Sequence, residues 1–189
     1  MSNAFSPMVS NPNTQYPQAL DRAAKVKLLV LDVDGVLTDG SLLIGPEGKE
    51  ALKVFDSLDG HGIKLLQSTG VAVAIITGRN SPMVEGRAKE LGIQHVQMGV
   101  SEKFKALELL LQRTGVPMNE CAAMGDDWPD LSILPKVQFS ACPAQAHEEV
   151  KKRVHFVTQK RGGAGAVREV CDLILLAQDN YQRLLQESL

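Results

Sequence analysis

The sequence predicts an α/β domain in which a mainly parallel sheet lies between helices on both faces. The first observation is that short apolar runs of strand length alternate with segments of helix length from Lys25 onward, as in parallel sheets. The second is the position of Gly70, Gly92 and Gly115, each directly after a helical pattern, where a left-handed residue commonly ends a helix. With 189 residues, the chain suits one compact domain.

Each element follows from a local pattern. Residues 1–24 are rich in Pro, Asn, Ser and Gln without periodicity, which predicts a flexible leader before a single domain at 25–189. The expected strands are the apolar runs 26–33, 71–77, 93–98, 120–125, 137–141 and 154–157, with a β-hairpin near 40–55. The expected helices are 59–69, 81–91, 101–114, 127–134, 144–152 and a C-terminal tail helix at about 164–188.

Composition argues against several classes of protein. The net charge is only −2 and aromatic residues make up 4%, which disfavours a nucleic-acid partner. No apolar stretch approaches a membrane span, and no secretory pattern opens the chain, so we expect a cytoplasmic protein without a membrane partner. Cys121, Cys142 and Cys171 are widely spaced, which predicts buried free thiols rather than a zinc site.

Two carboxylates stand one residue apart in Asp32-Val33-Asp34-Gly35-Val36-Leu37-Thr38-Asp39, directly after the first apolar run. Strand residues alternate faces, so Asp32 and Asp34 point the same way at the carboxyl end of that strand, where open α/β sheets bind ligands. Carboxylates crowded there repel unless a cation lies between them or one takes a proton. The stretch alone also fits an Asp-rich turn.

The octet resembles the first motif of the haloacid dehalogenase superfamily, and three later segments match further motifs in family order. These are Thr77-Gly78-Arg79 after the second strand, Lys103 at the start of a helix, and Gly125-Asp126-Asp127-Trp128-Pro129-Asp130 after a short strand. Each is weak alone, whereas the ordered set is specific. The resemblance implies a three-layer, Rossmann-like domain that catalyses phosphoryl transfer.

The same resemblance assigns the catalytic roles. Asp32 is the nucleophile that forms an aspartyl-phosphate, and Asp34 protonates the leaving alcohol and later activates water. Thr77 and Lys103 hold the phosphoryl oxygens and offset the charge of the transition state. Without the family, Lys103 also fits an ordinary solvated lysine.

A divalent cation is also expected. The metal-suited side chains near the motifs are carboxylates, which indicate a hard cation, and Mg²⁺ most naturally. The resemblance implies direct ligation by Asp32 and Asp126, with the backbone carbonyl of Asp34. Asp127 or Asp130 would then contact the cation through water, or contact its ligands rather than the cation itself.

The spacing between motifs leaves no room for a cap domain. About 37 residues lie between Asp39 and Thr77, and the hairpin and one helix use them. Phosphoryl transfer gains from exclusion of water, so either a macromolecular substrate or a neighbouring subunit covers the site. Leu42, Leu43 and Ile44 on the hairpin fit an inter-subunit contact and, equally, packing on their own domain.

Residues 55–63, 74–79 and 125–130 together resemble a lidless tetrameric subfamily that contains 3-deoxy-D-manno-octulosonate 8-phosphate phosphatases. The match covers roughly residues 25–178. It implies a homotetramer acting on an acidic sugar phosphate in lipopolysaccharide precursor synthesis. Similar chains act on 2-keto-3-deoxy-nonulosonate 9-phosphate, and this substrate stays open. A catalytically silent interaction module is the alternative of another class, but the presence of Asp32 and Asp34 argues against it.

The subfamily resemblance also implies the residues that bind the sugar. They are Asp34, Asp56, Ser57, Leu58, Asp59, Gly60, Arg79, Arg87 and Lys103. A guanidinium binds carboxylate or phosphate in a fork, and helical spacing lets Arg79 and Arg87 face one pocket. Arg87 alone also fits a solvated helix arginine, and His61 is expected to be structural.

The last distinctive segment, 160–169, is Gly-rich and opens the final helix. It lacks the Lys-Ser or Lys-Thr of a phosphate-binding P-loop. It resembles the subfamily's Gly-Gly-x-Gly-Ala-x-Arg-Glu segment, a mobile tail that reaches an active site in the tetramer. A contact between Arg161 and substrate stays open.

Overall fold

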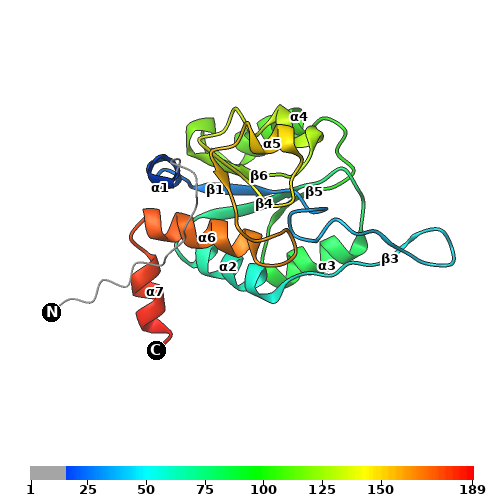
Figure 1. The fold of residues 1–189 in the computed structure, drawn as a ribbon, viewed down its shortest axis with the longest axis horizontal. Coiled ribbons are helices and arrows are strands. Elements are labelled where there is room, and N and C mark those ends of the chain that lie inside the picture. The colour runs from blue at the N-terminus through cyan, green and yellow to red at the C-terminus, as the bar shows by residue number, and fades with distance from the viewer. Residues whose placement is uncertain (1–15) are drawn as a thin grey trace.

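The computed structural model describes residues 16–189, and they form a sheet covered by helices on both faces (Figure 1). The six strands have the order β5-β4-β1-β6-β7-β8, and every hydrogen-bonded pair in this sheet is parallel. The predicted α/β architecture is therefore confirmed. The strands are β1 Leu28–Leu31, β4 Ala72–Ile76, β5 His95–Gln97, β6 Cys121–Met124, β7 Phe139–Cys142 and β8 Phe156–Val157.

The helices divide between the two faces of the sheet. Residues of α1, α2, α3 and α6 share one buried cluster, and those of α4 and α5 share the other. The helices are α1 Tyr16–Ala23, α2 Ser57–Ser68, α3 Pro82–Leu91, α4 Lys103–Thr114, α5 Glu148–Lys151, α6 Ala166–Ala177 and α7 Tyr181–Glu187, with short 3-10 helices η1 Met118–Glu120 and η2 Trp128–Ser132. Gly92 and Gly115 end α3 and α4 in the left-handed conformation, as expected.

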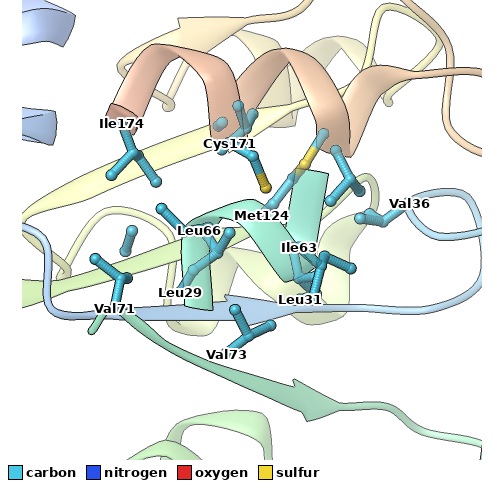
Figure 2. Packing of buried hydrophobic residues seen from close by; sticks show 14 of the residues in the cluster. Leu29, Leu31, Val36, Ile63, Leu66, Val71, Val73, Met124, Cys171 and Ile174 are labelled. Carbon is cyan, nitrogen blue, oxygen red and sulfur yellow. The ribbon is translucent and has the colours of Figure 1, made fainter. Parts of the chain in front are cut away.

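Strand β1 is buried on both faces because it lies between β4 and β6 with helices above and below. Leu29 and Leu31 point into the cluster that contains Ile63 and Cys171 (Figure 2). Leu28 and Val30 point into the cluster under α4. Burying a leucine stabilises the fold by about 1.5–3 kcal/mol, so this apolar run anchors the loop that follows it.

The hairpin of β2 (Leu43–Ile44) and β3 (Glu50–Leu52) is a separate antiparallel pair that projects from the body of the molecule (Figure 1). Leu42, Leu43 and Ile44 are 45%, 41% and 54% exposed. Of the two alternatives for these side chains, packing on their own domain is therefore wrong. Between β1 and β4, the described chain holds only this hairpin and α2, so no cap domain is present there.

Helix α1 occupies residues that we expected in the flexible leader. Its small residues Ala19 and Ala23, one turn apart, are fully buried and allow close packing of α1 on α6. The Gln178 side chain also donates a hydrogen bond of 2.7 Å to the carbonyl of Val26. The folded part of the chain therefore begins before Lys25, and the rest of the predicted leader, 1–15, lies outside the described residues.

Three expected helices differ from their predictions. The tail helix is two helices, α6 and α7, because Asp179 takes a left-handed φ of 58° between them. The helix expected at 127–134 is the 3-10 helix η2, and the one at 144–152 contracts to α5. In both cases the chain turns sharply after a strand before a short helical segment forms.

Two further features of the fold concern the cysteines and the helices. The three cysteines are free and buried, as predicted. Among residues 16–189, every helix is too short or too polar to traverse a lipid bilayer.

Candidate active site

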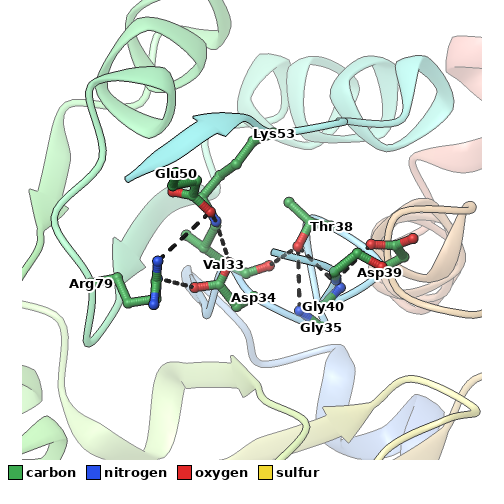
Figure 3. A network of polar contacts seen from close by, with 10 residues as sticks. Val33, Asp34, Gly35, Thr38, Asp39, Gly40, Glu50, Lys53 and Arg79 are labelled. Carbon is green, nitrogen blue, oxygen red and sulfur yellow. Dashed lines mark hydrogen bonds and ion pairs between the residues drawn. The ribbon is translucent and has the colours of Figure 1, made fainter. Parts of the chain in front are cut away.

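The first motif forms a tight loop at the carboxyl end of β1. The Asp32 N–H donates to the carbonyl of Met124 at 3.1 Å, which ties the loop to β6. Thr38 is buried, donates to the Val33 carbonyl and accepts from the N–H of Gly40 (Figure 3). Gly35 has a φ of +84°, and a Cβ there would lie 2.0 Å from the carboxylate of Asp126. The first and last motifs therefore meet only because residue 35 has no side chain.

Lys103, at the start of α4, brings the third motif to the first. Its side chain is 5% exposed, and its ammonium lies 2.9 Å from Asp32 Oδ2 and 2.6 Å from Asp130 Oδ1. Burial alone would lower the pKa of Lys103, but the charges of Asp130 and Asp32 outweigh it and raise the pKa above its ordinary value. Lys103 is therefore a fixed positive charge beside the expected nucleophile, rather than a solvated lysine.

Asp130 fixes the position of Lys103 and of the loop that follows β6. Its Oδ1 accepts from Lys103, and its Oδ2 accepts from the backbone N–H groups of Asp126 and Asp127 at 3.1 and 3.3 Å. The carboxylate is almost fully buried. Gly125 leaves room for it, since a Cβ there would lie 2.3 Å from its Cγ. Asp130 thus orients both the lysine and the loop that carries Asp126.

Asp32, Asp126 and Asp130 form a cluster in which one oxygen from each lies within 4.8 Å of the others. Burial, with the nearby charge of Asp130, raises the pKa of Asp32 to about 6. Burial, with the charges of Asp130, Asp32 and Asp127, raises the pKa of Asp126 to about 7. A divalent cation relieves such repulsion, and three close carboxylates are a donor set suited to Mg²⁺.

A cavity of about 390 Å³ opens over these residues. Its lining includes all residues expected to catalyse or to bind metal, namely Asp32, Asp34, Thr77, Lys103 and Asp126. Thr77 lies at the end of β4, next to β1 in the sheet, and is buried. The structure therefore brings the four motifs, which are far apart in the sequence, around one cavity.

A network of charges surrounds Asp34, and two of its members, Glu50 and Lys53, were not predicted from the motifs (Figure 3). Lys53 donates to Asp34 Oδ1 and lies 2.8 Å from Glu50 Oε1. Arg79 Nε lies 3.6 Å from Asp34 Oδ2, and its side chain is 45% exposed at the cavity. In the sequence, Glu50 and Lys53 look like the other charged residues of an exposed hairpin, and no pattern distinguishes them.

The segment expected to bind the sugar, 56–60, lies beside this cavity rather than in its lining. The Asp56 side chain caps α2 by accepting from the N–H groups of Leu58 and Asp59. Asp59 is buried and accepts from the Arg168 N–H at 2.7 Å, at the start of α6. Ser57 and Leu58 are exposed. In this chain, Asp59 therefore supports α6, and Ser57 and Leu58 remain accessible to a ligand.

Arg79 and Arg87 do not share one pocket, in contrast to our expectation. Among residues 16–189, the lining of the catalytic cavity includes Arg79 but not Arg87. Arg87 donates to the carbonyl of Asp56 at 3.1 Å and pairs with Glu90 at 2.8 Å. Gly60 permits this, because a Cβ there would lie 2.3 Å from Arg87 Nη2. Arg87 thus holds the 56–60 segment in place.

The Gly-rich segment packs directly on the first motif. The Gly163 N–H donates to the Val36 carbonyl at 3.1 Å. Gln145 bridges the two segments, since its side chain donates to the Gly35 carbonyl at 2.7 Å and accepts from the Gly162 N–H at 2.9 Å. Arg161 is exposed. The segment therefore supports the loop that carries the first motif.

Comparison with known proteins agrees with this geometry. Residues 96–170 match the model of a family described as haloacid dehalogenase-like hydrolase. The chain is 45% identical to 3-deoxy-D-manno-octulosonate 8-phosphate phosphatase of Yersinia pestis over 163 residues, which are 86% of this chain and 87% of the relative. It is 40% identical to the enzyme of the same name from Salmonella typhimurium over 189 residues, 100% of both chains.

A solved structure has the same fold. It is that of 3-deoxy-D-manno-octulosonate 8-phosphate phosphatase from Moraxella catarrhalis, in complex with a magnesium ion, a phosphate ion and a KDO molecule, and it superposes with a TM-score of 0.88. The two chains are 41% identical, and the match covers 91% of this chain and 98% of the other. The likeness therefore extends through the whole fold.

Proposed function

This chain belongs to the 3-deoxy-D-manno-octulosonate 8-phosphate phosphatases within the haloacid dehalogenase-like hydrolases, and we propose that it hydrolyses this sugar phosphate with Mg²⁺ as cofactor. The observation that carries the proposal is the constellation of Asp32, Asp126, Asp130 and Lys103 around one cavity. It combines a buried nucleophile, a set of cation ligands and a fixed positive charge, which are what phosphoryl transfer requires.

The carboxylates fit Mg²⁺. Asp32 and Asp126 offer one oxygen each within the 4.8 Å cluster, and Asp34 adds the backbone carbonyl that the family resemblance implies. Asp130 has both oxygens engaged, by Lys103 and by two backbone N–H groups, so we assign it to the support of the ligands. When bound, Mg²⁺ supplies positive charge that offsets the phosphoryl oxygens.

The first half of the reaction transfers the phosphoryl group to the protein. A carboxylate oxygen of Asp32 bonds to phosphorus while the bond from phosphorus to the ester oxygen of the sugar breaks. Asp34 gives a proton to that oxygen, and the sugar leaves as an alcohol. Lys103 and Thr77, which line the cavity, hold the phosphoryl oxygens. The products of this half are the free sugar and an aspartyl-phosphate.

The second half returns the protein to its starting state. Asp34, now a carboxylate, takes a proton from water as the water oxygen bonds to phosphorus. The bond between phosphorus and Asp32 breaks, which releases inorganic phosphate and restores the Asp32 carboxylate. Asp34 is again protonated, so no further proton donor is needed.

The remaining substrate contacts and the assembly follow from the same proposal. Arg79 is the exposed cation of the cavity, and we assign it to the sugar carboxylate. The exposed leucines of the hairpin and the exposed Ser57 and Leu58 support a homotetramer in which neighbouring subunits cover the site. The reaction would then take place in the cytoplasm, where lipopolysaccharide precursors are made.

Phosphate release from two substrates tests this function. With Mg²⁺, we expect preferential hydrolysis of 3-deoxy-D-manno-octulosonate 8-phosphate over 2-keto-3-deoxy-nonulosonate 9-phosphate, and no release after chelation. The matched variant Asp32→Asn keeps the volume of the side chain but removes the nucleophile, and we expect at least about a 10⁴-fold loss of kcat. Preference for the nonulosonate 9-phosphate would show that it, rather than the octulosonate 8-phosphate, is the substrate. Activity of Asp32→Asn would contradict the mechanism.

A further inference from the structure

Lys53 is a lysine with almost no contact with solvent. Its side chain is 1% exposed, although it follows β3 on a hairpin where most residues from 41 to 52 are exposed. Buried ammonium groups require partners, because an unpaired charge away from water is costly. Both partners of Lys53 are carboxylates, Asp34 and Glu50, and Figure 3 shows the ammonium between them.

Of these two carboxylates, Asp34 is the proposed general acid and base, and Glu50 is not assigned a catalytic role. Asp34 is 23% exposed in the cavity, whereas the Glu50 side chain is 7% exposed, with its Oε1 2.8 Å from the Lys53 ammonium and 3.9 Å from Arg79 Nη2. Glu50 therefore fixes Lys53 from the protein side. Since Lys53 is itself withdrawn from the cavity, it does not contact the substrate, and its influence on the reaction passes through Asp34.

The contact distinguishes the two oxygens of Asp34. Lys53 donates to Oδ1. Oδ2 has Arg79 Nε at 3.6 Å, beyond hydrogen-bonding distance, on a side chain that is 45% exposed. Oδ1 is occupied by the buried ammonium, whereas Oδ2 has no hydrogen bond from Arg79, so Oδ2 is the oxygen left for the leaving group and water to reach.

We propose that Lys53, held by Glu50, is a positioning residue that anchors Asp34 Oδ1 and leaves Oδ2 to exchange the proton with the leaving group and with water. This inference rests on the proposed function, because it assigns Asp34 as the general acid and base. It also links the hairpin to catalysis, since Glu50 lies in β3 and Lys53 follows it. Neither residue is distinguished by any motif.

The nature of the leaving group provides the test. Release of the sugar alcohol needs a proton from Asp34, whereas p-nitrophenyl phosphate releases a stable nitrophenolate that needs none. The value of kcat/KM reports only the steps up to departure of the leaving group. General acid catalysis contributes about 10²–10⁴-fold, so Lys53→Met should lower kcat/KM about 100-fold for the sugar phosphate and less than about 3-fold for p-nitrophenyl phosphate.

Several variants make the test specific. Lys53→Arg, which keeps the charge, should lose less kcat/KM for the sugar phosphate than Lys53→Met does. Glu50→Gln should also lose less than Lys53→Met, and its loss should again be larger for the sugar phosphate than for p-nitrophenyl phosphate. Lys49→Met removes an exposed lysine of the same hairpin and should change neither value. In an Asp34→Asn background, Lys53→Met should have no additional effect on the sugar phosphate, because Lys53 acts through Asp34.

Two results would overturn the proposal. Equal losses with both substrates would indicate a structural role for Lys53, and unchanged kcat/KM for the sugar phosphate would exclude any role. Retained p-nitrophenyl phosphate activity shows in the same assay that the variant is folded. If the wild-type protein does not hydrolyse the octulosonate 8-phosphate, the proposed substrate is wrong. The ratio of kcat/KM between the wild type and Lys53→Met, measured with the nonulosonate 9-phosphate, which is also an alkyl ester, then decides the role of Lys53.

Discussion

Gly162 is the position where a single methyl group should disturb the site most directly. A Cβ at this residue would lie 1.8 Å from the carbonyl oxygen of Gly35 and 2.8 Å from the side-chain nitrogen of Gln145. The first of these atoms belongs to the backbone of the loop that carries the first motif, so a rotamer change cannot relieve the clash. In Gly162→Ala, we expect the Gly-rich segment to move away from residues 35–38.

The cost follows from the contacts that this movement breaks. Overpacking a well-packed interior costs about 1–3 kcal/mol. The hydrogen bonds from the Gly163 N–H to Val36 and from the Gly162 N–H to Gln145 contribute about 0.5–1.5 kcal/mol each. We expect a loss of about 3 kcal/mol of unfolding free energy, since the segment can shift in part. For a domain of this size, that corresponds to a fall in Tm of about 6–12 °C.

Thermal unfolding followed by circular dichroism measures this effect, and Gly86→Ala is the matched control. Gly86 lies inside α3, and a Cβ there meets no atom within 4 Å. The same substitution should therefore stabilise the protein by about 0.5–1 kcal/mol through helix propensity. A Tm of Gly162→Ala within about 2 °C of wild type would refute the packing argument.

Three further predictions concern the metal, the lysine and the first helix. The raised pKa values of Asp32, about 6, and Asp126, about 7, mean that Mg²⁺ competes with protons. Its affinity should therefore fall as the pH drops from 8 to 6, with proton release measurable by calorimetry in two buffers; a pH-independent affinity would contradict this. Lys103→Met leaves two buried carboxylates unpaired and should cost about 3–5 kcal/mol in urea unfolding, whereas a loss below about 1 kcal/mol would show that the pair is not needed. Ala19→Asp places a charge at a fully buried position of α1 and should cost about 2–4 kcal/mol, while Gln18→Asp, on the exposed side, should be near neutral; equal effects would show that α1 does not pack on the core.

The positions of the motifs were predictable because they depend on local patterns. Asp32 and Thr77 follow apolar runs that can only be buried strands, and parallel strands place their carboxyl ends at one edge of the sheet. Lys103 begins a helix whose pattern is clear in the sequence. These local rules place the ends of the two strands at one edge of the sheet, and the family resemblance of the motifs added the expectation that Lys103 and Asp126 lie there too.

The sequence by itself thus determined the α/β class and the order of most elements, because periodicity and strand ends are properties of short segments, and the family resemblance of its motifs indicated the residues proposed for catalysis. Only the tertiary structure decided that Lys53 is buried against Asp34, that Asp59 supports α6, and that the Gly-rich segment lies on the loop of the first motif. Such contacts join residues 19 or more positions apart, and they depend on where the chain returns after each turn. A charged residue on a hairpin has the same local pattern whether it faces water or a carboxylate. Its burial is set by the path of the whole chain.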